Sequence, residues 1–321
     1  MEQLPAIDWT FAASTGRALL HPGPELSATA IADVVADLRQ AAVRATAHVA
    51  EVTLLDRPAP ADVLVVDRAS WVGAVSQSAH AMLAGVGAPE PATPLEAARA
   101  RVLGAQAGVV FAVIAGRILG QFDPFVEAPR LLLVAPNVVA TERQLGARPA
   151  DFRLWVCLHE ETHRFQFGRA PWLRGHLLAL LGELLAGDEL RFGWPDAGRP
   201  GTVRDLITNP AQREAFDQVT AVMSLMEGHA DVMMDRVGSR VVPSHAAIRS
   251  AFEARRDAQG WGAWVRRLFG LDLKRKQYSD GAAFCRMVID AAGVETLNRA
   301  FDAPGLLPTL TEIHDPQLWL H

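Results

Sequence analysis

The sequence has few cysteines, a single tyrosine and no recognisable leader segment. Cys157 and Cys285 are the only cysteines among 321 residues, so the chain lacks the disulfide framework that holds small secreted domains together. Residues 1–20 contain no basic segment followed by a continuous apolar stretch and a small-residue cleavage site, which is the pattern of a secretory signal. We therefore expect a cytoplasmic protein.

The chain also lacks a long apolar run and a large excess of either charge. The longest apolar stretch, 102–116, has about 15 residues and contains Gln106, whereas a membrane-spanning helix needs about 20. The net charge of -5 provides no positive field that would attract nucleic acid. We therefore expect neither a membrane span nor a nucleic-acid partner. With 50% hydrophobic and 21% charged residues, the composition is that of a globular protein.

What the sequence does have is a dominant helical period. Apolar residues recur three and four positions apart over several stretches, as in amphipathic helices. The predicted helices cover residues 25–52, 66–83, 95–119, 152–167, 171–186, 210–238 and 279–292. Two N-caps are predicted, Asp151 for the helix from 152 and Asn209 for the helix from 210. Glycine or alanine stands at every fourth position from 104 to 120, which predicts a smooth ridge on which another backbone can pack closely.

Signals for β structure are few. Residues 130–134, Arg-Leu-Leu-Leu-Val between Pro129 and Pro136, are the best strand candidate. Such a strand either offers an exposed edge to an extended peptide or has that edge covered by a loop, and the sequence leaves both interpretations open. The predicted fold class is therefore mainly α with a small β element.

The expected helix 152–167 contains the pattern H-E-x-x-H, from His159 to His163. Because residues four apart stack on one face of a helix, both imidazoles can bind one cation at about 2.0 to 2.1 Å, with Glu160 beside them. The alternative is a polar helix face with two accidental histidines, which would leave buried polar groups without partners at a cost of several kcal/mol. The pattern predicts a Zn²⁺ site. Cys157 faces away from the two histidines and is predicted to pack in the core.

A zinc ion that keeps one position open for water needs a third protein ligand. Glu227 is the leading candidate, because Asp231 stands one turn later on the same helix face and can orient a ligand imidazole. Glu183 follows His163 by 20 residues on the next helix and is the second candidate. His229 or another histidine is the third. The sequence alone leaves this choice open.

Two of these segments carry a resemblance to a known family. His-Glu-Glu-Thr-His-Arg-Phe-Gln-Phe at 159–167 and Ser-Leu-Met-Glu-Gly-His-Ala-Asp-Val-Met-Met-Asp at 224–235 resemble the bacterial type 2 zincin-like metallopeptidase family. The similarity extends to residues 102–104, 119–123, 133–137 and 276–284. Members have been labelled as hydrolases, and some as associated with biosynthesis of a deazaflavin coenzyme. The resemblance implies a zincin-like helical fold and favours Glu227 as a ligand, but it names no substrate.

On this basis we expect one zincin-like domain over 1–321, with a mainly helical part at 1–145 and a metal-site part at 146–321. The β element is expected beside the H-E-x-x-H helix. His159, His163 and Glu227 would bind zinc. Oligomeric state and substrate identity are not indicated by the sequence.

The predicted activity is that of a zinc-dependent hydrolase, most simply a peptidase acting on a peptide or small amide. Glu160 would take a proton from the attacking water and deliver it to the leaving amine. Tyr278 is a candidate donor to the developing negative charge, with His229 and His245 as alternatives. The bland interpretation of Tyr278 is a tyrosine packed at a helix start with its hydroxyl in water.

Two other classes of function remain open from the sequence. A zincin-like scaffold could keep the metal for folding, or bind a partner, without turnover. A helical binding protein without zinc is the third hypothesis. The scaffold differs from a hydrolase in that Glu160 has no catalytic role. The binding protein differs from both in that it contains no zinc.

Overall fold

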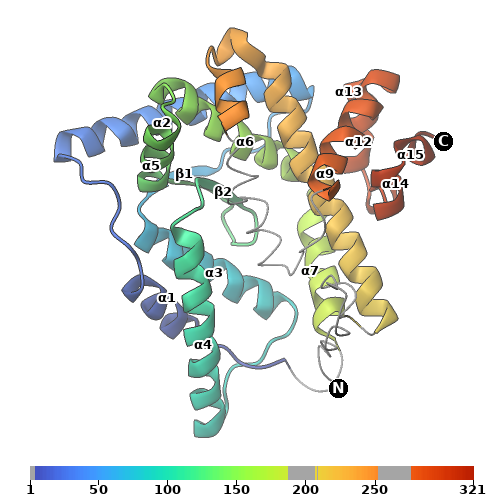
Figure 1. Ribbon diagram of the computed structural model, residues 1–321. Helices are drawn as coiled ribbons and strands as arrows, with labels where there is room; N and C mark the ends of the chain where they lie inside the picture. Colours follow the sequence, from blue (N-terminus) through green and yellow to red (C-terminus); the bar gives the residue numbers. More distant parts are fainter. Residues whose placement is uncertain (1–3, 187–206, 208, 252–275) are drawn as a thin grey trace, which may run out of the picture.

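The computed structural model describes residues 4–186, 207, 209–251 and 276–321, with the backbone alone for 276–279. Helices dominate this part of the chain, and the mainly α fold with a small sheet is confirmed (Figure 1). The longer helices are α1 (Trp9–Ala18), α2 (Ala28–Thr53), α3 (Arg68–Gly85), α4 (Pro94–Ala115), α5 (Ala135–Leu145), α6 (Pro149–Arg169), α7 (Leu173–Leu185), α9 (Pro210–Val241) and α12 (Lys276–Ala292). Short helices follow at α13 (Val294–Asn298), α14 (Leu310–His314) and α15 (Pro316–Leu320).

The sheet has three strands in the order β1 (Asp62–Val66), β3 (Arg130–Val134) and β2 (Gly120–Asp123). β1 runs parallel to β3, and β2 runs antiparallel to it. The strand predicted at 130–134 is confirmed, but both interpretations that placed it at an edge, open to a peptide or covered by a loop, are wrong, because it is paired on both sides. Its buried leucines explain this central position: Leu131 and Leu133 are fully buried. β2 is an outer strand of this sheet.

Most predicted helices are confirmed within a few residues, and their ends have local causes. Asn209 caps α9 as expected, accepting a hydrogen bond from the N–H of Ala211 at 2.9 Å. The prediction that Asp151 caps α6 is wrong, because the helix begins earlier, at Pro149. Asp151 instead accepts hydrogen bonds from the N–H and hydroxyl of Ser244, and so ties the start of α6 to the segment after α9.

Helix α6 is buried on nearly every side. It contacts α2, α9, β2 and β3, and Figure 1 shows it in the interior beside the sheet. Phe152 and Phe165, near its two ends, are fully buried in cores shared with these elements. Burying a side chain of this size contributes about 1.5 to 3 kcal/mol. The apolar packing therefore holds α6 in one place and orientation. Cys157 is fully buried, as predicted.

Buried ion pairs fix the rotation of α6 about its own axis. Arg153 donates two hydrogen bonds to Glu142 of α5, at 2.8 and 3.1 Å, and one to Asp37 of α2 at 2.6 Å. One helical turn beyond the first histidine, Arg164 donates to Glu161 at 2.7 Å, and Glu161 also accepts from the Thr46 hydroxyl of α2. Bidentate arginine–carboxylate pairs are directional, so α6 cannot rotate without breaking the pair between Arg153 and Glu142. Arg164 and Glu161 both belong to α6, and the hydrogen bond from Thr46 is what ties Glu161 to α2.

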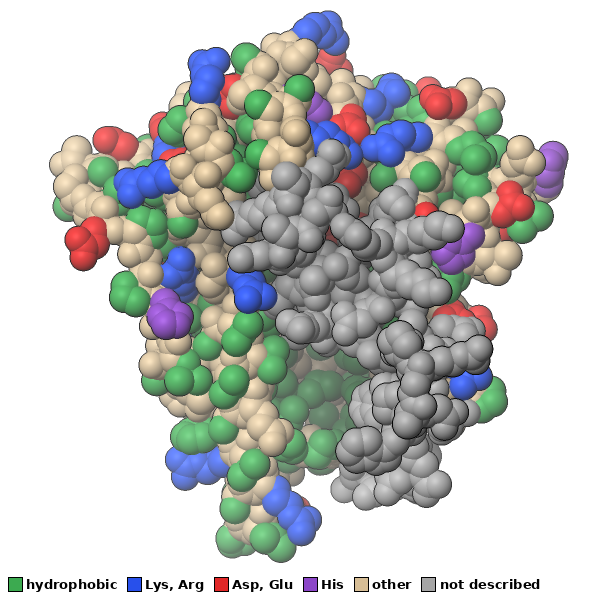
Figure 2. All heavy atoms as spheres, viewed as in Figure 1, with side chains coloured by type: hydrophobic (Ala, Val, Ile, Leu, Met, Phe, Trp, Pro, Cys, Tyr) green, Lys and Arg blue, Asp and Glu red, His purple; other side chains and the backbone are tan. Residues whose placement is uncertain are grey.

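The ridge of small residues predicted on α4 is the surface on which α1 packs. A Cβ atom at Gly104 would overlap the carbonyl of Asp8, and one at Gly108 would overlap the carbonyl of Ala12. The two backbones therefore approach too closely for any larger side chain. The opposite face of α4 is exposed at Val102, Val109 and Val113, and Figure 2 shows hydrophobic side chains along the column where Figure 1 places α4.

By length and composition, α4 passes the test for a helix that could cross a membrane. The apolar run 102–116 alone is shorter than a membrane-spanning helix needs. The helix is longer than this run, because it extends back to Pro94, where Thr93 and Glu96 form a capping box. Of the most apolar stretch of α4, 28% is buried in the structure, and α1 covers that buried side. This single helix shows no membrane span.

The close approach of α1 and α4 gives a stability test whose sign is informative. Changing Gly to Ala inside a helix normally stabilises it by about 0.5 to 1 kcal/mol, because glycine loses more backbone entropy on folding. For Gly108→Ala we expect the opposite, a loss of about 1 to 3 kcal/mol, because the new methyl group overlaps the backbone of α1. Denaturant unfolding measures both effects.

Gly175→Ala in α7 is the matched control, because a Cβ atom at Gly175 meets no other atom within 4 Å. This control should gain the stability that helix propensity predicts. Equal gains for both variants would contradict the packing of α1 on α4.

Candidate metal centre

Three potential metal ligands converge between α6 and α9. His159 and His163 lie one turn apart on α6, and their Nε2 atoms are 3.1 Å from each other. Glu227, from the middle of α9, places Oε2 3.5 Å from Nε2 of His159 and Oε1 3.6 Å from Nε2 of His163. All three side chains are 13 to 18% exposed, so the cluster is partly desolvated but open on one side.

The separations between these donor atoms fit a small tetrahedral ion. Bonds of about 2.0 to 2.1 Å at tetrahedral angles place neighbouring ligand atoms about 3.4 Å apart. The separation of 3.1 Å between the two nitrogens lies near this value, and so do the 3.5 and 3.6 Å from the nitrogens to Glu227, which are measured to its two different carboxylate oxygens. Two imidazole nitrogens and one carboxylate oxygen are also a donor set that zinc uses in catalytic sites. The residues present therefore fit a zinc ion that keeps a fourth position open.

The other two candidate ligands lie elsewhere. Glu183 is exposed on α7, where its charge acts on His176. His229 lies two residues after Glu227 but is fully buried, with its Nδ1 3.0 Å from the side-chain nitrogen of Gln166. Of the described residues, only His159, His163 and Glu227 form a group that could hold a metal ion.

The packing of α12 on α9 holds the Glu227 segment in place. A Cβ atom at Gly228 would overlap the backbone of Gly281 in α12, and one at Gly281 would overlap the carbonyl of Ser224. The two helices therefore cross in backbone contact directly beside Glu227. This explains why a glycine follows the glutamate in the middle of a long helix, where glycine otherwise costs about 1 kcal/mol.

Glu160 faces the sheet beside the triad. Glu160 is 4% exposed, and its side chain packs against Gly120 of β2, where any side chain would overlap it. Burial raises the pKa of Glu160 to about 7; the charge of His159 opposes this effect, that of Glu227 adds to it, and a hydrogen bond from the backbone of Phe122 lowers the pKa. A carboxyl group with a pKa near 7 can both accept and release a proton at neutral pH. The sequence analysis missed Gly120, because only the pairing of β2 places it there.

The two histidines of the triad differ in charge before any metal binds. Burial lowers the pKa of His159, but the hydrogen bond and charge of Glu227 outweigh burial and raise it to about 9. Burial is the largest influence on His163 and lowers its pKa. At neutral pH His159 is therefore charged and His163 neutral, and His159 donates a proton toward Nε2 of His163 across 3.1 Å. In the metal-free protein this proton lies among the atoms that would hold the metal.

The remaining predicted site residues have mixed outcomes. Asp231 is half-buried one turn after Glu227, and its negative charge favours the charged form of His159. That Asp231 orients a ligand imidazole stays a prediction. Tyr278 lies in the first turn of α12, and its side chain is outside the described residues. His245 is placed beside Asp235, with Nε2 3.5 Å from a carboxylate oxygen, and so belongs to a separate ion-pair cluster.

A group of three aromatic side chains, which no sequence pattern indicated, adjoins the triad. Phe167 stands one turn after His163 on α6, and its ring contacts Phe122 of β2 and Phe125 at centroid distances of 5.8 and 6.4 Å. All three residues are partly exposed. They form an apolar, partly open surface between the C-terminal half of α6 and the end of β2.

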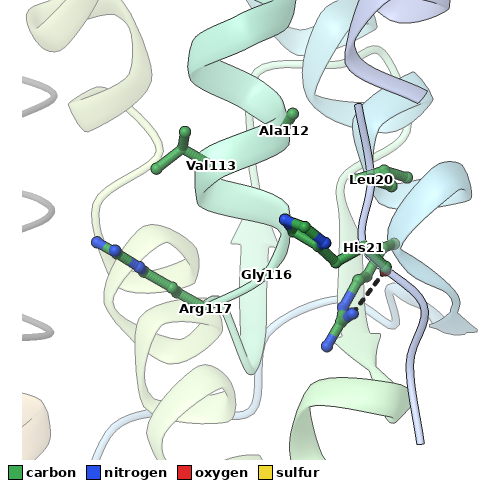
Figure 3. A pocket seen from close by; sticks show the side chains of 7 residues that line it. Leu20, His21, Ala112, Val113, Gly116 and Arg117 are labelled. Atoms are coloured by element: carbon green, nitrogen blue, oxygen red, sulfur yellow. Dashed lines mark hydrogen bonds between the residues drawn. The ribbon is translucent and has the colours of Figure 1, made fainter. Parts of the chain in front are cut away.

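A separate cavity of about 280 Å³ shares no residue with the triad. It lies against α4, where Ala112, Val113 and Gly116 form much of its wall, and Figure 3 shows His21 beside them. Arg68 also lines it. The guanidinium of Arg68 donates to the carbonyls of His21 and Pro22 and to the side chain of Asn137. Arg68 therefore fastens the segment after α1 to α3 and α5, and we assign no chemistry to this cavity.

Comparison with known proteins agrees with the geometry. Residues 7–320 match the sequence model of a family described as zincin-like metallopeptidase. A solved structure from Chloroflexus aurantiacus, described as that of "a putative hydrolase with a novel fold", is similar to this chain. The two are 29% identical, with a TM-score of 0.75, and the match covers 98% of this chain and 97% of that one.

No functionally curated protein matches this chain. The family and the similar structure support a hydrolase, and the family implies a metal, usually zinc. The resemblance found in the sequence is thereby confirmed. The chain belongs to the zincin-like metallopeptidase family.

Proposed function

We propose that this protein is a zinc-dependent peptidase in which His159, His163 and Glu227 bind the metal and Glu160 transfers the proton. The observation that carries this proposal is the convergence of two imidazole nitrogens, 3.1 Å apart, with the carboxylate of Glu227, whose two oxygens lie 3.5 and 3.6 Å from them, next to a buried carboxyl group with a pKa near 7. Each part alone has a structural explanation, such as an ion pair or a packed acid. Together they supply a metal site and a base within one helical turn.

The ligand set favours zinc over harder cations. Imidazole nitrogens suit zinc, whereas magnesium and calcium prefer sites made of oxygen atoms alone. When bound, zinc polarises a substrate carbonyl and lowers the pKa of a water molecule toward 7. Two neutral imidazoles and one carboxylate would leave this ion with a net local charge of +1, which suits that task.

Glu160 is placed to move the proton in this reaction. The N–H of Phe122 donates to its carboxylate, and Gly120 leaves space for it against β2, so its orientation is set by the sheet. It would accept a proton from the attacking water at one oxygen and then deliver that proton to the nitrogen of the leaving amine. Its raised pKa suits both steps, because neither protonation state is strongly disfavoured at pH 7.

The sheet favours an extended peptide as substrate. In the antiparallel pair, the N–H of Val134 donates to the carbonyl of Leu119, so alternate residues Gln121 and Asp123 also face β3. The backbone groups of Gly120 and Phe122 consequently face away from β3, on the side where Glu160 lies. The N–H of Phe122 is already bonded to Glu160, so an extended chain that adds to this outer strand would pair with its other backbone groups, and that pairing would align it beside the triad.

The aromatic group of Phe122, Phe125 and Phe167 favours substrates with an apolar side chain at one subsite. Partly exposed rings next to a reaction centre gain free energy when an apolar group covers them, at about 25 cal/mol per Å² buried. A charged side chain would lose hydration there. We therefore infer a preference for peptides with a large apolar residue next to the cleaved bond.

The first test changes Glu160 to Gln. If Glu160 transfers the proton, hydrolysis should fall by about 10²- to 10⁴-fold, the usual contribution of general acid–base catalysis, while bound zinc stays the same. The readout is cleavage of a mixed peptide library by mass spectrometry, with zinc measured on the same samples. Unchanged hydrolysis in Glu160→Gln would contradict the proposed mechanism, and a scaffold without turnover would show no cleavage in the wild type either.

Glu161→Gln is the matched control, because it makes the same chemical change one residue away. Glu161 is buried and bonded to Arg164 and Thr46, away from the triad. This variant should lose about 1 to 3 kcal/mol of stability, as expected when a buried hydrogen-bonded partner is impaired. Its folded fraction should retain hydrolysis. The reverse pattern for the two glutamates would mean that their roles have been exchanged.

The second test concerns the third ligand and the pH dependence of zinc binding. Untagged wild-type protein should bind close to one zinc per chain, Glu227→Ala should lose it and Glu183→Ala should keep it.

Because the pKa of His159 is about 9 without metal, zinc must displace its proton at neutral pH. Apparent zinc affinity should therefore rise with pH up to about 9. Titration calorimetry in buffers of different ionisation enthalpy measures the protons released, and binding without proton release would contradict the assignment.

A further inference from the structure

Gln166 connects the triad to the interior of the protein. It lies one turn after His163 on α6 and is fully buried. Its side-chain oxygen is 2.9 Å from Nδ1 of His163. Its side-chain nitrogen is 2.9 Å from the carbonyl of Met226 and 3.0 Å from Nδ1 of His229, both on α9. One amide thus contacts a triad histidine and the helix that carries Glu227.

These contacts determine which way the amide points. The carbonyl of Met226 can only accept a hydrogen bond, so the NH₂ group of Gln166 must face it. The oxygen of Gln166 then faces His163, and Nδ1 of His163 must be the donor. A neutral imidazole carries one proton, so its other nitrogen, Nε2, presents a lone pair. That lone pair points toward His159 and Glu227, as metal binding requires.

The far side of the contact is consistent with the same direction. Nδ1 of His229 accepts from Gln166, so the ring proton of His229 is on Nε2. The side chain of Asn298 acts on this ring in favour of its charged form, and its Nδ2 donates to the carbonyl of Thr53 at 2.8 Å. Among the described residues, Nε2 of His229 and Oδ1 of Asn298 are buried without a hydrogen-bond partner. Reversing Gln166 would place its side-chain oxygen against the carbonyl of Met226, which puts two acceptors together, whatever tautomers the two histidines then adopted.

We propose that Gln166 is a positioning residue that fixes His163 in the tautomer that presents Nε2 to the metal, with Met226 and His229 holding the amide in that orientation. The inference rests on the proposed metal centre, because its value lies in preparing a ligand. Groups that orient a ligand imidazole typically change metal affinity by about 10- to 100-fold. The alternative is that Gln166 only joins α6 to α9 and has no influence on the ligand.

The most direct test reads the tautomer without any metal. In metal-free protein with ¹⁵N-labelled histidine, NMR distinguishes Nδ1–H from Nε2–H rings, and the His163 signals are those lost in His163→Gln. We expect the Nδ1–H form for His163 and the Nε2–H form for His229. Finding His163 in the Nε2–H form, or exchanging between both forms, would overturn the proposal. This measurement stands even if the wild type failed to bind zinc, which would instead contradict the proposed function.

The second test compares two buried glutamines. Gln166→Met keeps the size of the side chain and removes both hydrogen-bonding groups. Gln212→Met is the matched control, because Gln212 is also buried and donates to two backbone carbonyls, those of Leu184 and Ala186, at 3.1 and 2.8 Å. Zinc affinity is measured by competition with a chelator, and stability by unfolding of the metal-free proteins.

Both variants should lose stability, but only Gln166→Met should weaken zinc binding, by about 10- to 100-fold. Gln166→Met should also let His163 populate both tautomers. Zinc affinity within threefold of the wild type in both variants would mean that Gln166 is only structural. Should Gln166→Met fail to fold, the tautomer in the wild type still decides the question.

Discussion

The structure depends on one electrostatic arrangement, a carboxylate from α9 held against two imidazoles from α6. Partly burying these polar groups is unfavourable unless they satisfy one another. In the metal-free chain His159 carries an additional proton. The charge of Glu227 stabilises this protonated form, and Nε2 of His163 accepts a hydrogen bond from His159. A zinc ion would replace that proton with a stronger partner for all three groups. The site is therefore built around a positive charge, whether that charge is a proton or a metal ion.

The surrounding elements restrict how that arrangement can move. Arg153 fixes the rotation of α6 through the buried carboxylate of Glu142, Thr46 of α2 bonds to Glu161, and Gly228 brings α9 into backbone contact with α12. The two adjacent glutamates of the motif consequently have different environments. Glu160 faces β2, and burial raises its pKa so that the neutral form is favoured more than usual. Glu161 faces α2 and forms an ion pair with Arg164. Neighbouring positions on a helix point about 100° apart, which is enough to separate a chemical role from a structural one.

Local patterns in the sequence predicted the parts that depend on local physics. The spacing of His159 and His163 fixes their common face, Asn209 is a strong N-cap, and the Asp231 spacing pointed to Glu227, which the structure brings to the histidines. Contacts that depend on tertiary packing could not be predicted from such local patterns. The position of β3 at the centre of the sheet, the space that Gly120 leaves for Glu160 and the orientation of Gln166 each depend on segments far apart in the chain. Asp151 failed as a cap because a proline two residues earlier began the helix.

The central claim is that a zinc ion binds among the side chains of His159, His163 and Glu227. Its most direct test is X-ray diffraction from zinc-soaked crystals at energies just above and below the zinc absorption edge. The account predicts one strong anomalous peak, about 2.0 to 2.1 Å from Nε2 of each histidine and from a carboxylate oxygen of Glu227. A peak at other residues, or no peak in crystals soaked with excess zinc, would contradict it.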